Sequence, residues 1–394
     1  MAIPRKYKIG VLCTAPSAQM SAQYEALRGL GEFHFVMLFM YGQEHNPAWG
    51  CKLPEGMESV ILPVPWYLPR RFRGRCNAKV SQVLDAHNCD ALILHGYYDR
   101  LALWQAIHWC RRHGRPYLVR TDANIDKEKS PLRRWWRKAA FGRNLTDAAA
   151  MLVIGEKNRQ YYELFGGRPS QFFLAPWEVD YEPLETTLAA AAPQREATRE
   201  RMGLRANEVV FVCVSRLLKL KGIGTVIEAV GRAAQKGLPV RLLIVGEGPH
   251  RTALERQISQ TNAPATLCGN LSRGDVALAL TASDVFVLAS TCEAWALVVN
   301  EACLAGLPLL LSDQVGAAAD LLIPGENGFV FPAGDVAALA GRMAEMVCDE
   351  PRRLRMARRS SEILSKWRRE YPAAEGYRQA LLYALGQGPA ATKK

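Results

Sequence analysis

Short runs of apolar residues alternate with longer amphipathic segments along most of the chain. In the first half, runs rich in Val, Ile, Leu and Phe are separated by segments whose apolar positions repeat at helical spacing. Short apolar strands that alternate with amphipathic helices predict a parallel sheet covered on both faces. The expected strands are residues 8–13, 33–39, 91–95, 116–120, 151–154 and 172–175, and the expected helices are 17–30, 78–88, 101–113 and 156–165.

This alternation stops between residues 182 and 206 and then starts again. The interruption is rich in alanine and contains Pro183, Pro193 and scattered charges, which is typical of a linker region, with part of it helical as an alternative. Beyond it the pattern predicts a second set of strands and helices. The strands are 208–214, 240–245, 266–268, 285–289 and 307–311, and the helices are 221–237, 250–260, 272–282, 336–350, 352–368 and 373–385.

A chain of 394 residues is long for a single hydrophobic core, so two domains are expected. We predict an α/β protein with two doubly wound parallel-sheet domains, residues 1–181 and 207–372, joined by the linker region 182–206. The C-terminal helix within 373–394 is expected to pack back on the first domain. Two such domains facing each other would place a cleft at the carboxyl ends of both sheets.

The chain carries a net charge of +12, and its positive residues cluster in the first domain. A basic face suits nucleic acid, anionic lipid or an acidic substrate, although it can also be a merely solvated surface. Trp135 and Trp136 stand among four of these basic residues and resemble an interfacial membrane anchor. The clusters are Arg70, Arg71, Arg73 and Arg75; Arg111, Arg112 and Arg115; and Arg133, Arg134, Arg137 and Lys138.

The ten cysteines form no CxxC pair, and no Cys/His spacing fits a zinc site. Several lie inside apolar strands, which indicates a reducing, cytoplasmic setting. The apolar stretch near the N-terminus, residues 9–13, is too short for a signal peptide. The sequence contains no run of 18 apolar residues, so no membrane span is expected. Any membrane contact is expected to be peripheral, on the inner face of the membrane.

Two carboxylates follow the strand at 285–289, in the stretch from Thr291 to Gly306. Glu293 comes first and Glu301 eight residues later. A loop that runs from a strand into a helix start presents unpaired backbone N–H groups, which form an anion site. Carboxylates beside such a site suit the hydroxyl groups of a nucleotide diphosphate sugar. The alternative is a capped surface helix with two solvated acids.

Two further loops leave predicted strands in the same half. Arg216 and Lys221 follow the strand at 208–214, where a guanidinium and an ammonium near a helix start suit a diphosphate. Gly246 and Gly248 follow the strand at 240–245, where glycines let a backbone approach a ligand closely. Taken alone, the first loop is equally consistent with an exposed basic loop, and a single GxG is a weak signal. The Asn327-Gly328 pair is expected to be a turn.

Taken together, these motifs resemble the C-terminal half of the retaining glycosyltransferases of family 4, which have the GT-B fold. The match is collinear from about Ala175 to Asp335. Arg216 and Lys221 correspond to the diphosphate-binding pair, and residues 246–249 correspond to the glycine turn. Glu293 and Glu301 correspond to the paired glutamates of the EX7E motif. Several motifs in order at matching intervals are specific in a way that no single motif is.

The resemblance implies a role for each matched residue. Arg216 and Lys221 would stabilise the leaving diphosphate, Glu293 would lie near the donor sugar, and Glu301 would hold ribose hydroxyls. The leaving phosphate would accept the acceptor's proton on the same face, which retains the anomeric configuration without a protein nucleophile. The remaining donor-side residues would contribute mainly backbone groups around the phosphate, sugar and base: Ala294, Trp295, Ala296, Leu297, Asn270 and Leu271.

The sequence departs from the family pattern at several positions. Ala294 and Ala296 replace the usual glycines after the first glutamate, which leaves an inactive homologue open as an alternative. The first domain matches weakly, and Asp122 falls where many relatives carry a histidine. Asp122 would either accept a proton from the acceptor hydroxyl or pair with Arg120, and pairing is favoured. The candidates on the acceptor side are His95, Ser17 and Arg120.

We therefore predict a retaining glycosyltransferase that moves a sugar from a nucleotide diphosphate sugar to a hydroxyl of a glycan or lipid-linked glycan. No acidic DxD motif lies near the donor loop, so no metal and no other cofactor is expected. The alternatives are a nucleotide-sugar epimerase or glycan phosphorylase on the same architecture, or a basic nucleic-acid-binding protein. Against the last, the positive clusters lie outside the motif-bearing half and no recognition motif accompanies them, so nucleic acid is not an expected partner.

Overall fold

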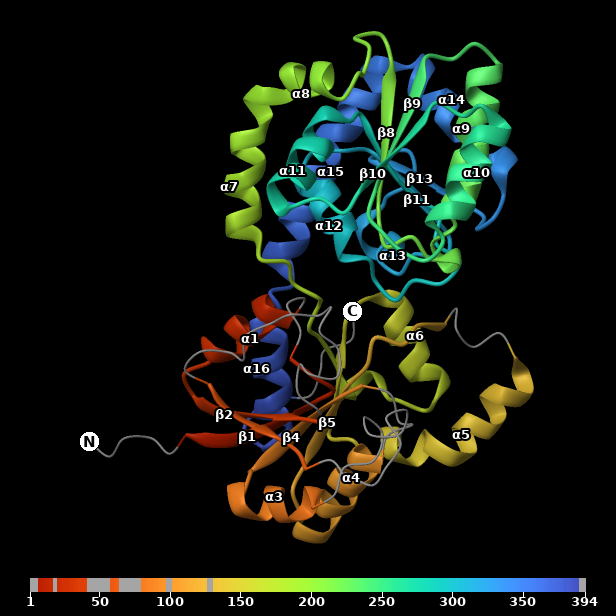
Figure 1. The fold of residues 1–394 in the computed structure, drawn as a ribbon. Helices are drawn as coiled ribbons and strands as arrows, with labels where there is room; N and C mark the ends of the chain where they lie inside the picture. Colours follow the sequence, from red (N-terminus) through yellow and green to blue (C-terminus); the bar gives the residue numbers. More distant parts are fainter. Residues whose placement is uncertain are drawn as a thin grey trace. The chain divides into compact units, whose positions relative to one another are not determined.

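The computed structural model describes residues 6–16, 20–40, 57–63, 79–96, 101–125 and 130–389. The chain forms two compact units. Unit 1 comprises Met1–Glu178 and Tyr371–Lys394, and unit 2 comprises Val179–Glu370. Each unit is a parallel β-sheet with helices packed on both faces (Figure 1).

Unit 1 contains a 7-stranded sheet in the order β3-β2-β1-β4-β5-β6-β7. The chain moves outward from β1 to β3, returns to β4 beside β1, and then moves to the other edge, so the switch point lies between β1 and β4. The strands are β1 (Tyr7–Cys13), β2 (Phe33–Phe39), β3 (Glu58–Ile61), β4 (Ala91–His95), β5 (Tyr117–Arg120), β6 (Ala150–Val153) and β7 (Phe172–Leu174).

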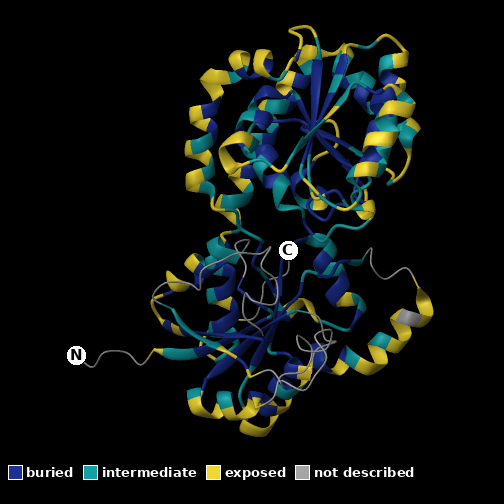
Figure 2. Cartoon of the chain, in the orientation of Figure 1, coloured by how far each residue is buried: buried dark blue, intermediate teal, exposed yellow. Residues whose placement is uncertain are grey.

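Side chains of alternate strand residues pack on opposite faces of this sheet. Val11 belongs to the core under α1 and α16, whereas its neighbour Leu12 belongs to the core under α3, α4 and α6. Both residues are buried, as are the strands in general (Figure 2). The helices of unit 1 are α1 (Ser21–Arg28), α3 (Val80–His87), α4 (Leu101–His113), α5 (Pro131–Thr146), α6 (Glu156–Leu164) and α16 (Ala373–Ala384).

Unit 2 contains a 6-stranded parallel sheet in the order β10-β9-β8-β11-β12-β13. Its switch point lies between β8 and β11. The strands are β8 (Val209–Val214), β9 (Val240–Val245), β10 (Ala265–Gly269), β11 (Val285–Leu288), β12 (Leu309–Ser312) and β13 (Gly328–Phe331). The helices are α7 (Tyr181–Ala191), α8 (Arg195–Arg201), α9 (Ile223–Gln235), α10 (Arg251–Thr261), α11 (Arg273–Ala282), α12 (Leu297–Leu304), α13 (Ala318–Leu321), α14 (Val336–Cys348) and α15 (Glu350–Glu370).

The segment expected to be a linker is part of unit 2. Residues 182–206 contribute most of α7 and all of α8, both of which pack against α11. Alanine has the highest helix propensity, and Pro183 lies in the first turn of α7, where its missing N–H is tolerated. Arg195 in α8 binds Asp284, just before β11, with 2.6 Å between Nη2 and Oδ1. The alanine and proline content therefore marked a helical pair and not a flexible connection.

Besides α7 and α8, the described elements without a counterpart in the sequence prediction are the short helix α13, strands β3 and β13, and helix α5. Strand β3 is only four residues long and lies at the sheet edge, and the sequence of α5 was interpreted only as a basic cluster with two tryptophans. Strand β13 begins at Gly328, directly after the expected turn, in which the Gly325 N–H donates to the Gly328 carbonyl at 2.9 Å. A glycine is required at 328 because a Cβ there would lie 2.0 Å from the Leu309 carbonyl oxygen.

Candidate active site

The loops that carry the predicted donor residues leave neighbouring strands at the switch point of unit 2. Residues 215–222 follow β8, and residues 289–296 follow β11, which pairs with β8. Ligands of open α/β sheets bind beyond the carboxyl ends of the strands at such a point. The topology therefore puts the arginine–lysine loop and the glutamate loop at the same edge of one sheet.

These two loops are in direct backbone contact. The Thr291 N–H donates to the Leu220 carbonyl at 2.8 Å. Gly222 has a φ of +63°, and a Cβ at this position would lie 2.0 Å from the Ala289 carbonyl oxygen. Only glycine allows both the positive φ and the close approach, so Gly222 fixes the spacing between the loops.

Lys221 and Glu293 join the loops through their side chains. The Lys221 ammonium donates to Glu293 Oε2, and the Ser290 hydroxyl donates to the same oxygen at 3.3 Å. The two charged side chains are only 16% and 17% exposed. The structure therefore brings these two candidate residues into direct contact, and their roles toward a donor stay predictions.

Arg216 lies on the same loop but is exposed, and its side chain forms no hydrogen bond or ion pair with a described residue. Its backbone carbonyl accepts from the Leu218 N–H at 2.8 Å, which tightens the turn that carries it. A fixed loop with an uncompensated guanidinium is able to meet an anionic ligand without first breaking an ion pair.

The glycine turn after β9 supports the Arg216 loop. Gly246 has a φ of +136°, and a Cβ there would lie 2.0 Å from the Ser215 carbonyl oxygen; at Gly248 the equivalent distance to the Leu217 carbonyl oxygen is 2.5 Å. The Leu217 N–H donates to the Glu247 carbonyl at 2.9 Å. Packing against this loop accounts for both glycines, and direct donor contact by either one remains a prediction.

Residues 289–296, which we call the donor loop, are held in place by the segment after β12. The Gly316 N–H donates to the Glu293 carbonyl at 3.1 Å, and a Cβ at Gly316 would lie 1.9 Å from the Ala294 carbonyl oxygen. Ala296 has a φ of +80°, which is rare for a residue with a Cβ, and it immediately precedes α12. The loop therefore keeps a glycine-type conformation at Ala296 although alanine occupies it, and α12 begins at Leu297.

The indole of Trp295 points into the core of unit 2. Trp295 is 3% exposed, its Nε1–H donates to Asn300 Oδ1 at 3.0 Å, and its ring stacks on Trp367 of α15. The amide of Asn300 in turn donates to the Tyr181 hydroxyl at 2.9 Å. Any contact between residue 295 and a donor would thus have to come from its backbone, while its side chain anchors the loop.

Glu301 lies in α12, and burial raises the pKa of its carboxyl above the ordinary value. The positive charge of Arg273, the first residue of α11, opposes this rise in the pKa. Arg273 follows Asn270 and Leu271 on the loop after β10, so it belongs to the same neighbourhood. Sequence reasoning missed Arg273, which follows the helix cap directly: Ser272 Oγ accepts from the Asp275 N–H at 3.2 Å.

In unit 1, His95 and Arg120 end the neighbouring strands β4 and β5. Burial lowers the pKa of His95 well below its ordinary value and Arg120 lowers it further, so this imidazole is neutral. Arg120 is 2% exposed and donates to the Ala175 carbonyl at 2.6 Å and to Gln23 Oε1 at 3.0 Å. It also lies over the rings of Trp177 and Tyr377.

The favoured pairing of Asp122 with Arg120 is wrong. No ion pair joins them in the described part of the chain, because the Arg120 guanidinium is turned toward backbone carbonyls and Gln23. Asp122 is half-buried, and its other proposed role, toward an acceptor hydroxyl, stays a prediction. Ser17 lies outside the described residues.

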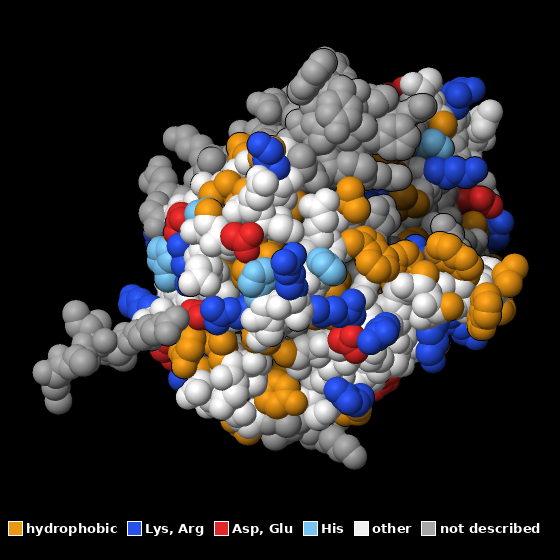
Figure 3. Space-filling view, turned by 90° about the horizontal axis from the view of Figure 1, so that it is seen from below, with side chains coloured by type: hydrophobic (Ala, Val, Ile, Leu, Met, Phe, Trp, Pro, Cys, Tyr) orange, Lys and Arg blue, Asp and Glu red, His pale blue; other side chains and the backbone are white. Residues whose placement is uncertain are grey.

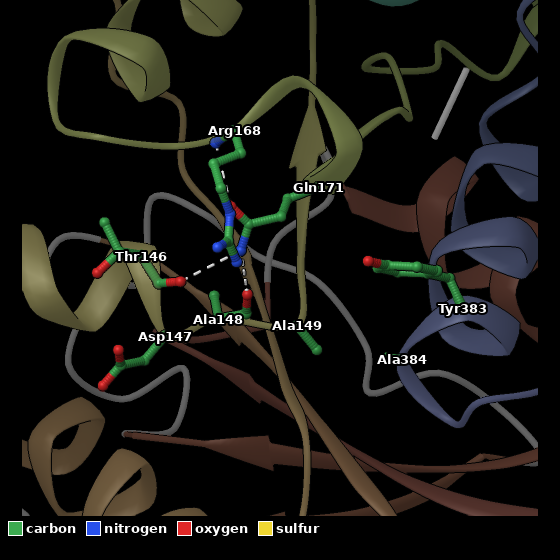
Figure 4. Close-up of a pocket in the computed structure, with 8 residues that line it drawn as sticks. All are labelled: Thr146, Asp147, Ala148, Ala149, Arg168, Gln171, Tyr383 and Ala384. Atoms are coloured by element: carbon green, nitrogen blue, oxygen red, sulfur yellow. Dashed lines mark hydrogen bonds between the residues drawn. The ribbon is translucent and has the colours of Figure 1, made fainter. Parts of the chain in front are cut away.

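Two cavities lie away from these residues. One, of about 780 Å³, is in unit 1 before β6 and β7, where Gln171 donates to the Ala148 carbonyl at 2.5 Å and accepts from Arg168 (Figure 4). The other, of about 310 Å³, is in unit 2 before β8 and β11, around Arg195 and Asp284. Both lie at the amino ends of strands, so neither matches the ligand position expected for these sheets.

The described residues contain no group of three or more His, Cys, Asp or Glu side chains placed to hold a metal ion. Eight of the cysteines are described, and all eight are free thiols. No helix found among the described residues has both the length and the apolar character needed to cross a membrane.

Residues 194–362 match the family model of the glycosyl transferases group 1. The alpha-monoglucosyldiacylglycerol synthase of Acholeplasma laidlawii is 29% identical over 164 residues, which is 41% of this chain and 40% of that protein. A GDP-mannose-dependent monoacylated alpha-(1-6)-phosphatidylinositol monomannoside mannosyltransferase of Corynebacterium glutamicum is 27% identical over 217 residues, 53% of this chain and 55% of that protein. The chain thus matches about half the length of these curated relatives.

Solved structures resemble the chain over nearly its full length. Sucrose-phosphate synthase from Thermosynechococcus elongatus has a TM-score of 0.73 at 20% identity, over 95% of this chain and 99% of that one. Anabaena HepE, solved in complex with UDP and glucose, has a TM-score of 0.69 at 17% identity, over 95% and 98%. At these identities the likeness establishes the fold, and the two Rossmann-like units are those of the GT-B class, as predicted.

Proposed function

We propose that the chain is a retaining glycosyltransferase of the glycosyl transferases group 1, whose family model matches residues 194–362. Its donor is a nucleotide diphosphate sugar and its acceptor is a hydroxyl group. The observation that carries this proposal is the contact between two loops at the switch point of unit 2, where Lys221 binds Glu293. Arg216 lies on the same loop as Lys221 and is exposed.

In the proposed complex the diphosphate lies against Arg216 and Lys221. Lys221 is held by Glu293, so its ammonium keeps one position and offers its other N–H donors to a phosphate oxygen. Negative charge builds on the diphosphate as the bond between the sugar C1 and the phosphate oxygen breaks. Lys221, which is only 16% exposed, stabilises that charge from a fixed position, and the exposed Arg216 adds a second cation.

The acceptor oxygen forms its bond to C1 on the face that the diphosphate leaves, and the acceptor proton passes to a phosphate oxygen of the leaving group. Bonds and charges balance, and the sugar keeps its anomeric configuration. Glu301 holds hydroxyl groups of the nucleotide ribose, and its position in α12 places it beyond the strained turn at Ala296. We propose that Arg216 and Lys221 carry the charge neutralisation, so that transfer needs no metal.

The relatives support a glycan or lipid-linked acceptor. The Acholeplasma relative is named for the synthesis of a glucosyldiacylglycerol, and the Corynebacterium relative for mannosyl transfer to a phosphatidylinositol monomannoside. By analogy we propose that this chain acts on such a hydroxyl in the synthesis of a polysaccharide or glycoconjugate. The free thiols are consistent with a cytoplasmic enzyme.

A thermal-shift panel of UDP, GDP, ADP and TDP identifies the nucleotide, because a ligand that binds the native state raises its melting temperature. The matching nucleotide sugars are then offered with candidate acceptors, with and without EDTA, and the anomeric configuration of the product is read by NMR. The proposal predicts a retained product in both conditions. An inverted product, loss of transfer in EDTA, or epimerised sugar without acceptor would contradict it.

A further inference from the structure

Helix α5 has one apolar and one basic side. Its apolar positions fall at Leu132, Trp135, Trp136, Ala139 and Ala140, which is the i, i+3, i+4, i+7, i+8 spacing of a single helix face. The intervening positions 133, 134, 137 and 138 are all Arg or Lys. The 16-residue helix contains no acidic residue.

The apolar side of α5 faces solvent and not a core. Leu132 is 76% exposed, Trp135 68% and Trp136 60%. Two neighbouring tryptophans and a leucine this exposed are unusual on a protein surface, where large contiguous apolar patches mark interaction sites. In Figures 1 and 2 the first part of α5 extends along the edge of unit 1 and is mostly exposed.

Neighbouring residues extend this apolar surface onto α4. Phe141 lies 5.5 Å from Trp104 and 6.1 Å from Trp136, measured between ring centroids. Trp104 and Leu101 on α4 are 39% and 46% exposed. We call Leu101, Trp104, Leu132, Trp135 and Trp136 the aromatic face. In Figure 3 hydrophobic side chains gather on the right of the molecule, at the position of α5, with Lys and Arg beside them.

The charges beside the aromatic face are available to a partner. Arg134 and Lys138 are exposed, and neither forms an ion pair with a described residue. By contrast, Arg111 of α4 binds Asp147 at 2.8 Å. Arg134 and Lys138 can therefore bind the negative charges of a partner, and the exposed tryptophans beside them can enter an apolar layer. A surface that is anionic with an apolar layer beneath it is complementary to both.

We propose that the aromatic face docks unit 1 onto an anionic lipid bilayer. Trp rings prefer the boundary between headgroups and acyl chains, and a helix with this division of residues lies in that plane. Leu132 and the tryptophans enter the boundary, while the long stems of Arg134 and Lys138 let their charges reach lipid phosphates. This inference concerns unit 1 only and does not depend on the donor site of unit 2.

The test is flotation of the full chain with two kinds of vesicle. One kind contains phosphatidylcholine alone, and the other is a mixture of phosphatidylcholine and anionic phosphatidylglycerol. We expect binding to the anionic vesicles that weakens as salt rises. The double variant Trp135→Ser/Trp136→Ser should lower the partition coefficient by more than about tenfold, because each buried aromatic contributes well over 1 kcal/mol. Reversing charge in Arg134→Glu/Lys138→Glu should lower it by at least about tenfold.

Two matched controls use exposed residues of unit 2. Leu354→Ser removes an apolar side chain that is 52% exposed, and Lys236→Glu reverses an exposed charge. Both should bind vesicles like the unchanged chain, and all variants should retain its circular dichroism and melting temperature.

Three outcomes would overturn the proposal. They are equal flotation with neutral and anionic vesicles, unchanged binding by the tryptophan double variant, and absence of vesicle binding together with salt-sensitive binding of a single-stranded oligonucleotide. The last would assign the aromatic face to base stacking. Nucleotide-induced thermal shifts, measured in parallel, report separately on unit 2.

Discussion

At the scale of single residues, the donor loop keeps a conformation that its sequence does not favour. Ala296 has a φ of +80° and a ψ of 81°, a region in which a Cβ is strained. The loop is held there by the contact of Gly316 with Ala294 and by the buried indole of Trp295. The surrounding packing therefore imposes this strain on Ala296.

Ala296→Gly should raise the free energy of unfolding by about 1 kcal/mol, because relief of the strain exceeds the extra entropy of glycine in the unfolded chain. Ala294→Gly is the matched control, since Ala294 is not among the described residues with positive φ, and it should lower the same free energy by about 0.5–1 kcal/mol. Urea denaturation of both variants checks this. Equal losses in the two variants would show that Ala296 is unstrained.

Glu301 is a second residue that lowers the stability of the protein in the absence of a ligand. The folded-state pKa of its carboxyl is raised above the ordinary value of 4.5, so the folded protein binds more protons than the unfolded chain above that pH. The Glu301 carboxyl therefore makes its full contribution to the free energy of unfolding at low pH, and this contribution is lost as the pH rises through the folded-state pKa. At neutral pH the buried carboxylate thus lowers stability.

Glu301→Gln should therefore increase the free energy of unfolding at pH 7, and the increase should shrink as the pH falls toward 4.5. The same variant should bind the nucleotide more weakly, because an amide accepts hydroxyl hydrogen bonds less strongly than a carboxylate. Glu200→Gln on the exposed side of α8 is the control and should change neither quantity. A gain in stability that is the same at both pH values would contradict the burial argument.

At the scale of elements, α12 and its loop are fastened to two other helices. The chain of contacts runs from Trp295 through Asn300 to Tyr181 at the start of α7, and from Trp295 to Trp367 near the end of α15. Arg368 lies 3.8 Å from the Tyr181 ring centroid, which holds that ring in place. Helices α7 and α15 thereby fix the position of the donor loop through contacts with Trp295 and Asn300.

Tyr181→Phe removes one hydroxyl from this chain of contacts and leaves the Asn300 amide without that acceptor. It should lower the free energy of unfolding by about 1 kcal/mol and increase hydrogen exchange in the donor loop. Tyr383→Phe is a matched control, because the Tyr383 hydroxyl forms no hydrogen bond within the described residues, and it should be nearly neutral. Unchanged exchange in the loop would show that Tyr181 does not position it.

Apolar runs predicted most of the buried strands, but they missed β13, which is buried and was interpreted as part of a turn. Strands such as β8 and β11 are continuous Val/Phe/Leu runs, so a single sequence was enough to place them. Helix α5 was not predicted, although its apolar positions repeat at helical spacing, because the segment was interpreted as a basic cluster. Residues 182–206 were interpreted as a linker with some helix, because the helical content of an alanine-rich segment depends on packing, here against α11.

At the scale of the whole molecule, the sequence predicted two parallel-sheet units and the loops that meet at one switch point. The strand order that brings β8 beside β11, and with it the ion pair between Lys221 and Glu293, was not predicted from the sequence. The inward direction of the Trp295 indole and the effect of the Arg273 charge on the pKa of Glu301 could not be predicted. Both depend on side-chain packing between elements distant in sequence.

Isothermal titration of the full chain with the nucleoside diphosphate chosen by the thermal-shift panel tests the central claim most directly. Arg216→Ala should weaken binding roughly tenfold or more, because a charge-assisted contact contributes about 1.5–3 kcal/mol. Lys219→Ala, an exposed lysine on the same loop, should bind like the unchanged chain. Equal affinity in all three proteins would show that the loop after β8 does not hold the diphosphate.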